Sequence, residues 1–341
     1  MTMSDLKGLK ALFIGGTGVI SSACSRRAVE LGADLHLLNR NVSSTRPIPD
    51  EATVITADVR DADQTRAALK DQEFDVVVNF LNFTPEHVAR DIDLFTGRTR
   101  QYVFISSAAT YQRPPGHLPL VESAPLGNPH SAYGRDKIAC EELLGRAHHE
   151  ERFPVTIVRP SHTYDRTAVP FDGGWTAVDR MRRGKEVLVH GDGTSLWTLT
   201  HHTDFARAFT GLLGNPAAVG ETFHITSDEV LSWDQIYLIV AEAVGVEPRL
   251  VHVPSDAVAA ADPRWGEELL GDKAHSMVFD NSKIRRIVPG FTAEIPFSEG
   301  AREIVAWYDA DPGRRVVDAR LNALMDRLID AHRPGTPPPV G

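Results

Sequence analysis

Residues 11–21 read ALFIGGTGVIS, in which four apolar residues run directly into a turn that holds Gly15, Gly16 and Gly18. The apolar run is typical of a buried β-strand, and the residues after the turn begin a helical pattern. Glycine lets the backbone turn tightly, while the first turn of a helix presents unpaired N–H groups and a positive dipole. This order favours a dinucleotide site over the alternative, an ordinary tight turn. Ser21 stands where a third glycine is usual, and serine is small enough to keep the helix close to the strand.

The first half of the chain continues this alternation of β-rich runs and amphipathic stretches. Strands are expected at 11–14, 35–38, 54–57, 76–80, 103–105 and 155–158, and helices at 21–31, 61–70, 85–95 and 133–148. Such alternation predicts βαβ units and a parallel sheet, and the unbroken apolar character of the strands indicates burial on both faces. The predicted fold class is α/β: a doubly wound parallel Rossmann sheet with a smaller α/β substrate domain.

The regularity ends after the sixth strand, which predicts a second domain. The dinucleotide-binding Rossmann domain is expected over residues 1–165, with residues 203–227 returning to it. Residues 166–202 and 228–332 are expected to form the substrate domain. Residues 333–341 are rich in proline and glycine and are expected to be a disordered tail.

Composition excludes several classes of partner. The net charge of −10 argues against a broad surface for nucleic acid or for an anionic membrane. The only cysteines, Cys24 and Cys140, lack metal-type spacing and indicate a reducing compartment without disulfides. Histidine pairs at 148–149 and 201–202 have no carboxylate or cysteine at ligand spacing, so no metal site is expected. The N-terminal apolar run is too short for a signal peptide or a membrane span, which predicts a cytoplasmic protein.

The end of the second strand bears on the choice of cofactor. An acidic residue there would bind an adenosine ribose and repel a 2′-phosphate. The chain has Asn39 followed by Arg40, whose guanidinium can clamp a phosphate with two hydrogen bonds, and Arg46 is expected to help. NADP(H) is therefore predicted, with NAD(H) as the alternative. Asp58, after the third strand, is placed to meet the adenine amino group, or else to cap the next helix.

A tyrosine and a lysine carry the chemistry of the predicted site. Tyr133 and Lys137 are four residues apart in a helical stretch, which places both side chains on one face. A phenol with a pKa of about 10 is a poor base at neutral pH, and a neighbouring ammonium lowers that pKa by stabilising the phenolate. Ser107, at the end of the fifth strand, is placed to hydrogen-bond the same substrate oxygen. Alone, such a pair is usually a surface feature of a helix; after a glycine turn it favours an acid/base site.

With these motifs in place, the sequence resembles the extended short-chain dehydrogenase/reductases, in the NAD-dependent epimerase/dehydratase group of nucleotide-sugar enzymes. The matching segments span roughly the first 225 residues: GGTGVIS at 15–21, VFISSAATY at 103–111, SAYGRDK at 131–137, VRPSHTY at 158–164 and GDGTSLWTLTHHTDFARA at 191–208. The resemblance implies that Tyr133 is the acid/base and that Ser107 polarises the reacting carbonyl or alcohol. It also implies that Lys137 holds the nicotinamide ribose and lowers the pKa of Tyr133.

The full cofactor-binding set combines the residue patterns with this resemblance. It comprises Gly15, Thr17, Gly18, Val19 and Ile20 at the pyrophosphate, Asn39, Arg40, Asp58, Val59, Phe80 and Leu81 on the adenosine side, and Lys137, Pro160 and His162 near the nicotinamide.

Three departures from the family pattern affect the expected substrate. Ala108-Ala109 stand where sugar dehydratases have an Asp-Glu pair, which argues against a 4,6-dehydratase. Trp197 stands where a diphosphate-binding arginine is common, and the stretch 271–280, GDKAHSMVFD, lacks a second customary arginine. A smaller polyol, sugar or sugar phosphate is therefore favoured, with Ser107, Tyr133 and Trp197 as substrate-binding residues. The basic run at 180–185 is expected to be a solvated helix face. In these respects the chain looks closer to a divergent branch that includes the chloroplast stem-loop-binding proteins.

These features predict an NAD(P)-dependent enzyme of carbohydrate metabolism. It would transfer hydride at a secondary alcohol or ketone of a carbohydrate-like small molecule, as an epimerase or an oxidoreductase. A nucleotide-sugar 4-epimerase is one alternative, and a non-catalytic nucleotide-sensing or RNA-binding protein on the same scaffold is another. The expected partner is a sugar-like small molecule, without nucleic acid or membrane, and a homodimer is one assembly compatible with this interpretation.

Overall fold

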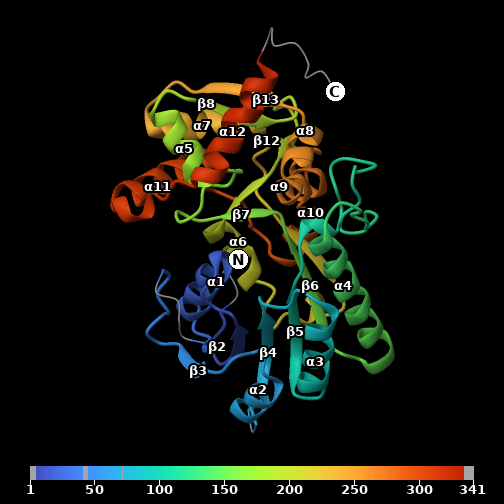
Figure 1. Cartoon of the computed structure of the whole chain (residues 1–341). Helices are drawn as coiled ribbons and strands as arrows, with labels where there is room; N and C mark the ends of the chain where they lie inside the picture. The colour runs from blue at the N-terminus through green and yellow to red at the C-terminus, as the bar shows by residue number, and fades with distance from the viewer. Residues whose placement is uncertain (1–4, 41–44, 71, 334–341) are drawn as a thin grey trace.

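A seven-stranded sheet organises the N-terminal lobe of the protein (Figure 1). The structure is a computed structural model that describes residues 5–40, 45–70 and 72–333. All pairings in the sheet are parallel, and the strand order is β11-β6-β5-β4-β1-β2-β3. The strands are β1 (Lys10–Ile14), β2 (Asp34–Asn39), β3 (Thr53–Thr56), β4 (Phe74–Asn79), β5 (Thr99–Ile105), β6 (Val155–Pro160) and β11 (Thr222–Ile225).

Helices cover both faces of this sheet. They are α1 (Val19–Glu30), α2 (Ala62–Ala68), α3 (Pro85–Phe95), α4 (Ala132–Glu151) and α6 (His202–Thr210). Phe13 of β1 packs in one core with residues of α1 and α6, whereas its neighbours Leu12 and Ile14 pack in another with residues of α3 and α4. Because successive side chains of a strand point to opposite faces, unbroken apolar strands fill both cores. The predicted α/β, doubly wound parallel fold is confirmed.

The edge strand β3 departs from the predicted burial. Val54 is 39% exposed, and both threonines of the strand are also exposed. Within the described residues, β3 is the last strand in the order and pairs with β2 alone, so one of its edges stays uncovered by a neighbouring strand. Burial on both faces was therefore a wrong expectation for this strand.

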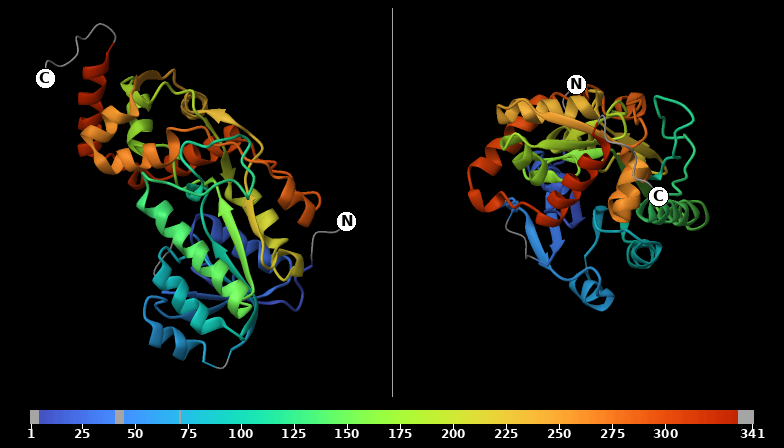
Figure 2. Two further views of the ribbon diagram at one scale, coloured as in Figure 1. Left: turned by 90° about the vertical axis from the view of Figure 1, so that its right-hand side faces the viewer. Right: turned by 45° about the horizontal axis from the view of Figure 1, so that its top comes forward.

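The helix α10 (Ser282–Ile287) and the 3-10 helix Pro216–Ala218 pack in the core of the N-terminal lobe. The second lobe contains most of the other elements (Figure 2). Its short strands pair as β7 with β10, β8 with β13 and β9 with β12. The bounds are β7 (His162–Tyr164), α5 (Gly174–Arg182), β8 (Glu186–His190), β9 (Leu196–Trp197), β10 (Leu199–His201), β12 (Leu231–Ser232), α7 (Trp233–Val244), β13 (Arg249–Val253), α8 (Ser255–Ala261), α9 (Pro263–Glu268), α11 (Phe297–Asp309) and α12 (Ala319–His332), with short 3-10 helices at Ala108–Thr110 and Pro312–Arg314 and a π-helical turn at Leu269–Lys273.

The basic run at 180–185 is only in part the solvated face that was expected, because Arg183 and Lys185 are exposed whereas Arg180 is buried. Arg180 is 2% exposed, and its guanidinium contacts Asp326 at 2.7 Å and the side-chain oxygen of Asn322 at 2.7 Å. Arg182 pairs with Asp309. These arginines join α5 to α11 and α12, because α5 packs inside the lobe rather than on its surface.

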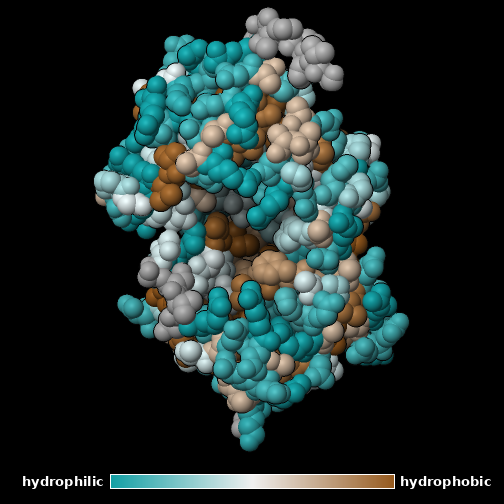
Figure 3. Space-filling model, viewed as in Figure 1, coloured by the Kyte–Doolittle hydropathy of each residue, from teal (hydrophilic) through white to brown (hydrophobic). Residues whose placement is uncertain are grey.

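The topology opens a crevice at the carboxyl ends of β1 and β4. The chain passes from β1 outward to β2 and β3 and then crosses to β4 on the other side of β1. Ligands of doubly wound sheets bind at such a reversal of strand order. Figure 3 shows a hollow between the two lobes in which apolar side chains are exposed.

The predicted tail and the predicted domain boundaries are not tested by the described residues. The predicted tail falls on residues 334–341, outside the described residues, whereas Arg333 is described and pairs with Glu186 at 2.8 Å. The domain boundaries at 165, 202 and 227 stay predictions. Among the described helices, none is long and apolar enough to span a membrane.

Candidate active site

The glycine turn joins β1 to α1 in a conformation that its residues require. Gly15 has a φ of 88°, and a Cβ built there would lie 2.5 Å from Leu81 Cγ. Only glycine adopts this left-handed backbone without steric cost. The buried hydroxyl of Ser21 donates to the Gly15 carbonyl at 2.7 Å and accepts from the Gly18 N–H at 2.7 Å. Serine in place of a third glycine therefore holds the turn closed.

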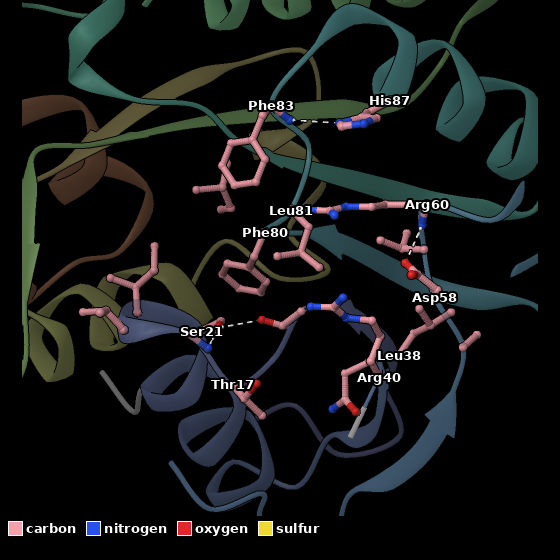
Figure 4. Close-up of a pocket in the computed structure, with 18 of the residues that line it drawn as sticks. Thr17, Ser21, Leu38, Arg40, Asp58, Arg60, Phe80, Leu81, Phe83 and His87 are labelled. Carbon is pink, nitrogen blue, oxygen red and sulfur yellow. Dashed lines mark hydrogen bonds between the residues drawn. The ribbon is translucent and has the colours of Figure 1, made fainter. Parts of the chain in front are cut away.

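A cavity of about 410 Å³, the cofactor cavity, opens beside this turn (Figure 4). Eleven residues of the predicted cofactor set line it: Gly15, Thr17, Gly18, Val19, Ile20, Asn39, Arg40, Asp58, Val59, Phe80 and Leu81. The free amides at the N-terminus of α1, the bare glycine backbone and the apolar walls together fit a dinucleotide. The sequence thus predicted which segments gather here, while the role of each residue stays a prediction.

Arginine side chains reach into the cofactor cavity from two strand ends (Figure 4). Arg40 follows β2 and Arg60 follows β3, and Arg90 of α3 also lines the cavity. Among the described lining residues, Asp58 is the one carboxylate. Arg60 and Arg90 were missed by sequence reasoning, although Arg60 lies only two residues beyond the predicted Asp58. The excess of positive charge favours an anionic cofactor.

Two expectations about this region are corrected. Arg46 does not help Arg40, because its Nε lies 2.6 Å from a carboxylate oxygen of Asp165. This ion pair joins Arg46 to the segment that follows β7. Asp61 caps α2 by accepting the Gln64 N–H at 2.9 Å, so the capping alternative for Asp58 is wrong.

Lys137 is buried beside the end of β5. Its Nζ donates to the backbone carbonyls of Asn82 at 2.5 Å and Ile105 at 2.7 Å. The side-chain amide of Asn82 donates in turn to the buried carboxylate of Asp91 at 2.8 Å, which fixes the segment that holds the lysine. Burial lowers the pKa of Lys137 to about 8, because the ammonium loses its hydration.

Tyr133 lies one helical turn before Lys137, near the start of α4. Its side chain is 41% exposed, and Lys137 Nζ lies 5.7 Å from its ring centroid. Desolvation raises the pKa of Tyr133, and the hydrogen bond with Ser107 opposes that rise only in part. In the protein chain itself the pKa of Tyr133 is therefore raised, opposite to the lowering by Lys137 that the sequence suggested.

A second, smaller cavity of about 200 Å³, the substrate cavity, opens beside Ser107, two residues beyond the end of β5. Ser107, Pro160, His162 and Trp197, all predicted site residues, line it. Burial lowers the pKa of His162 to about 4, so its imidazole is neutral at physiological pH. Among the described residues that line this cavity, Asp272 is the one charged group, and sequence reasoning missed it.

Trp197 contributes to the substrate cavity in a different way from the one expected. Its side chain is 2% exposed, and its ring packs against Trp233 at a centroid distance of 5.7 Å. The open indole face expected for sugar stacking is therefore not present. Within the described chain its Nε1 is buried without a hydrogen-bond partner. Trp197 therefore places an uncharged indole in the cavity wall, at the position where an arginine was expected from the family pattern.

The whole arrangement matches a known family. The sequence pattern of the NAD dependent epimerase/dehydratase family matches residues 11–226, well over half of the chain. The chain belongs to this family. Membership confirms the predicted enzyme of the extended short-chain dehydrogenase type.

Relatives of this epimerase/dehydratase protein differ in activity. It is 26% identical over 326 residues to the 2′-dehydrokanamycin reductase of Streptomyces kanamyceticus, covering 94% of this chain and 90% of the relative. It is 28% identical to the chloroplast stem-loop binding protein of 41 kDa b of Arabidopsis thaliana, covering 71% of this chain and 65% of the relative. The proteins similar to this chain thus include reductases, epimerases and dehydratases of carbohydrate-like molecules, which agrees with the predicted hydride transfer.

Solved structures of low identity share the fold. A UDP-glucose 4-epimerase of Thermotoga maritima, solved with UDP-glucose, superimposes with a TM-score of 0.72 at 19% identity and covers 89% of this chain and 99% of its own. An epimerase of Methanothermobacter thermautotrophicus gives a TM-score of 0.73 at 16% identity, covering 91% of this chain and 95% of its own. At such identities the likeness concerns the fold alone.

The structure locates the departures from the family pattern. Ala108 and Ala109 line the substrate cavity at the positions expected for the Asp-Glu pair of sugar dehydratases. Arg113 is buried, and its guanidinium lies 3.3 Å from the Asp272 carboxylate, so this nearby cation is already paired. Lys273 likewise lies 3.3 Å from the carboxylate of Asp172. The substrate cavity therefore offers little attraction for a diphosphate.

Proposed function

We propose that this protein reduces a ketone, or oxidises the corresponding secondary alcohol, on the ring of a small sugar or glycoside with NADP(H). Ser107, Tyr133 and Lys137 are the proposed catalytic residues. The observation that carries the proposal is their grouping at the carboxyl end of β5. Ser107 lines the substrate cavity, Lys137 donates to the carbonyl of Ile105, and Ile105 lines the cofactor cavity.

Each residue has one chemical task in this proposal. The nicotinamide, when bound, supplies the hydride that forms the new C–H bond at the carbonyl carbon. Tyr133 gives its phenolic proton to the carbonyl oxygen, so that the ketone becomes an alcohol. Ser107 donates a hydrogen bond to the same oxygen as negative charge develops there. Lys137 holds a ribose hydroxyl and keeps a positive charge near the phenolate that remains.

The experiment is a survey of keto sugars and keto glycosides that includes 2′-dehydrokanamycin. Loss of nicotinamide absorbance with one ketone supports net reduction. Turnover of a sugar without net change in absorbance favours epimerisation through a transient ketone. The lack of either reaction, with cofactor bound, would overturn the proposal.

A nucleotide-sugar 4-epimerase is the alternative within the same class, and the two proposals differ in the expected affinity for UDP. Because the substrate cavity is lined by Trp197 and Asp272 rather than by a free cation, UDP should bind the cofactor-loaded protein only weakly. We expect a Kd in the millimolar range, which corresponds to about 4 kcal/mol. Calorimetry decides between the alternatives, since micromolar binding of UDP would restore the nucleotide-sugar reading. Arg182, paired with Asp309 on α11, would then have to leave that pair to act as a clamp.

Arg40 is the proposed determinant of cofactor choice. If it clamps a 2′-phosphate, Arg40→Ala should weaken NADP(H) binding by about 1.5–3 kcal/mol, the range for hydrogen bonds to charged groups. The affinity for NAD(H), which lacks that phosphate, should barely change. Arg60→Ala is the matched variant, because Arg60 lines the same cavity from the neighbouring strand end. Titration that finds equal losses for both cofactors in Arg40→Ala, or a wild-type preference for NAD(H), would refute the assignment.

A binding protein of another class is favoured by one observation, the likeness to a chloroplast stem-loop binding protein. The net charge of −10 and the intact catalytic set oppose it. Binding of a stem-loop RNA at physiological salt, together with the lack of turnover, would support it. The division into two domains at the stated boundaries, a homodimer and a cytoplasmic location complete the proposal.

A further inference from the structure

A third cavity, of about 690 Å³, lies between the two lobes and is distinct from both cavities described above. Its walls come from α1, α6 and residues 45–47 of the N-terminal lobe, and from residues 165–167 and α11 of the second lobe. Figure 1 shows α11 across from α1 on the side of the molecule opposite α4. This third cavity is called the inter-lobe cavity below. Apart from Arg46, which was expected to help clamp the 2′-phosphate, none of its described lining residues was predicted to bind cofactor or substrate.

The inter-lobe cavity is positively charged in a protein of net charge −10. Its described lining residues include four arginines, Arg26, Arg46, Arg166 and Arg314, and two carboxylates. Both carboxylates are already engaged, Asp165 with Arg46 at 2.6 Å and Glu303 with His201 at 3.1 Å.

Two arginines are left without a carboxylate partner in the described chain. Arg26 of α1 and Arg166, which follows β7, are both exposed at this cavity, one from each lobe. Arg314 stacks on the Trp307 ring, with its guanidinium carbon 4.2 Å from the ring centroid. A guanidinium presents two parallel N–H groups that match the oxygens of a phosphate. Arg26 and Arg166 therefore offer hydrogen-bond donors to a phosphate from the two sides of the cavity.

His202 adds a second observation. It lies in the first turn of α6, and in the described chain its Nδ1 is buried without a hydrogen-bond partner. Burial, with contributions from the charges of His201, Arg26 and Arg46, lowers the pKa of His202 to about 4. A bound anion would supply both a partner for the ring and a compensating charge. The pKa of His202 should therefore change when an anion occupies the cavity.

We propose that the inter-lobe cavity binds a small phosphorylated molecule, whose phosphate is held by Arg26 of one lobe and Arg166 of the other. Ala306 and Trp307 of α11 supply an apolar wall for the rest of the ligand. Because the two arginines belong to different lobes, the ligand fastens the lobes together. This site does not rest on the proposed function, since it shares no described lining residue with the cofactor or substrate cavity.

Pyrophosphate is the probe, titrated calorimetrically into the whole protein with NADP(H) present so that the glycine turn does not compete. The wild-type protein should bind it, and Arg26→Ala/Arg166→Ala should lose at least tenfold in affinity, the usual effect of removing hydrogen bonds to a charged group. Arg286→Ala, which removes an exposed arginine of α10 outside this cavity, should leave the affinity unchanged. Thermal unfolding of all variants checks the fold.

The imidazole of His202 gives an independent readout by NMR. Its pKa should rise when pyrophosphate binds the wild-type protein and should stay low in the double variant. No binding at about 10 mM pyrophosphate, well above the millimolar scale of weak contacts, would overturn the proposal. Equal binding by the double variant, or binding that leaves the His202 signals unmoved, would also overturn it, because the anion would then lie elsewhere.

Discussion

Tyr133→Phe should lower turnover by about 10²–10⁴-fold, the usual contribution of a positioned general acid. The substitution removes the phenolic proton while keeping the ring against Phe83, 6.4 Å away between centroids. Because Tyr133 is 41% exposed, the loss of its hydroxyl should change the stability of the fold little. Affinity for the cofactor should also stay nearly unchanged. Steady-state rates with the ketone found in the substrate survey, and a cofactor titration, measure both quantities.

Tyr164→Phe is the matched control for this experiment. Tyr164 is buried in the core of the second lobe, and its hydroxyl has no hydrogen-bond partner in the described chain. Removing the same atom there should leave turnover within a few-fold of the wild type, as expected for a residue outside the proton path. Wild-type activity in Tyr133→Phe would refute the proposed mechanism.

Much of the fold and the cofactor cavity was predictable because it depends on local signals. The run into Gly15 marks a strand, a left-handed turn and a helix start, and the structure has all three. Continuous apolar strands specify two covered faces, which fixes a doubly wound sheet. In such a sheet the carboxyl ends of β1 and β4 face one crevice, so residues after each strand gather there. Segments such as 15–20 and 80–81 therefore line the cofactor cavity as predicted.

What could not be predicted depends on contacts between distant segments. Arg46 turns to Asp165, a partner 119 residues away that no local pattern reveals. Trp197 was expected to present its face to a substrate, but the second lobe packs Trp233 against it. Asp272 enters the substrate cavity from a π-helical turn, and nothing in its neighbours in the sequence marks it.

The pKa values of the proposed catalytic residues Tyr133 and Lys137 shift in the opposite sense to the one expected from the sequence. Sequence spacing alone suggested that the ammonium of Lys137 would lower the pKa of Tyr133. Desolvation instead lowers the pKa of Lys137, which the nearby Cys140 and Glu141 oppose only in part. Desolvation also raises the pKa of Tyr133, which the hydrogen bond with Ser107 opposes only in part. In the protein chain the lysine is therefore the group that titrates closer to neutral pH.

Lys137→Met should weaken cofactor binding and turnover together, because one ammonium serves the ribose and the phenolate. We expect about a tenfold loss of cofactor affinity, the lower end for a hydrogen bond to a charged group, and a larger loss of turnover. Methionine fills the space of the buried lysine side chain but leaves the carbonyls of Asn82 and Ile105 without their donor. Thermal unfolding must therefore accompany the kinetics, with Lys283→Met, a partly exposed lysine of α10, as the control.

The pH dependence separates the role of Lys137 from a purely structural one. Its pKa is lowered to about 8, so the ammonium is present below that pH and is lost as the pH rises through it. Wild-type turnover should therefore fall on the basic side of about pH 8, and the phenol should contribute only at higher pH because the pKa of Tyr133 is raised. Lys137→Met has no such group, and its residual activity should stay level across the same interval. A variant that kept the basic limb, or that lost only affinity or only turnover, would show that the lysine does not serve both groups.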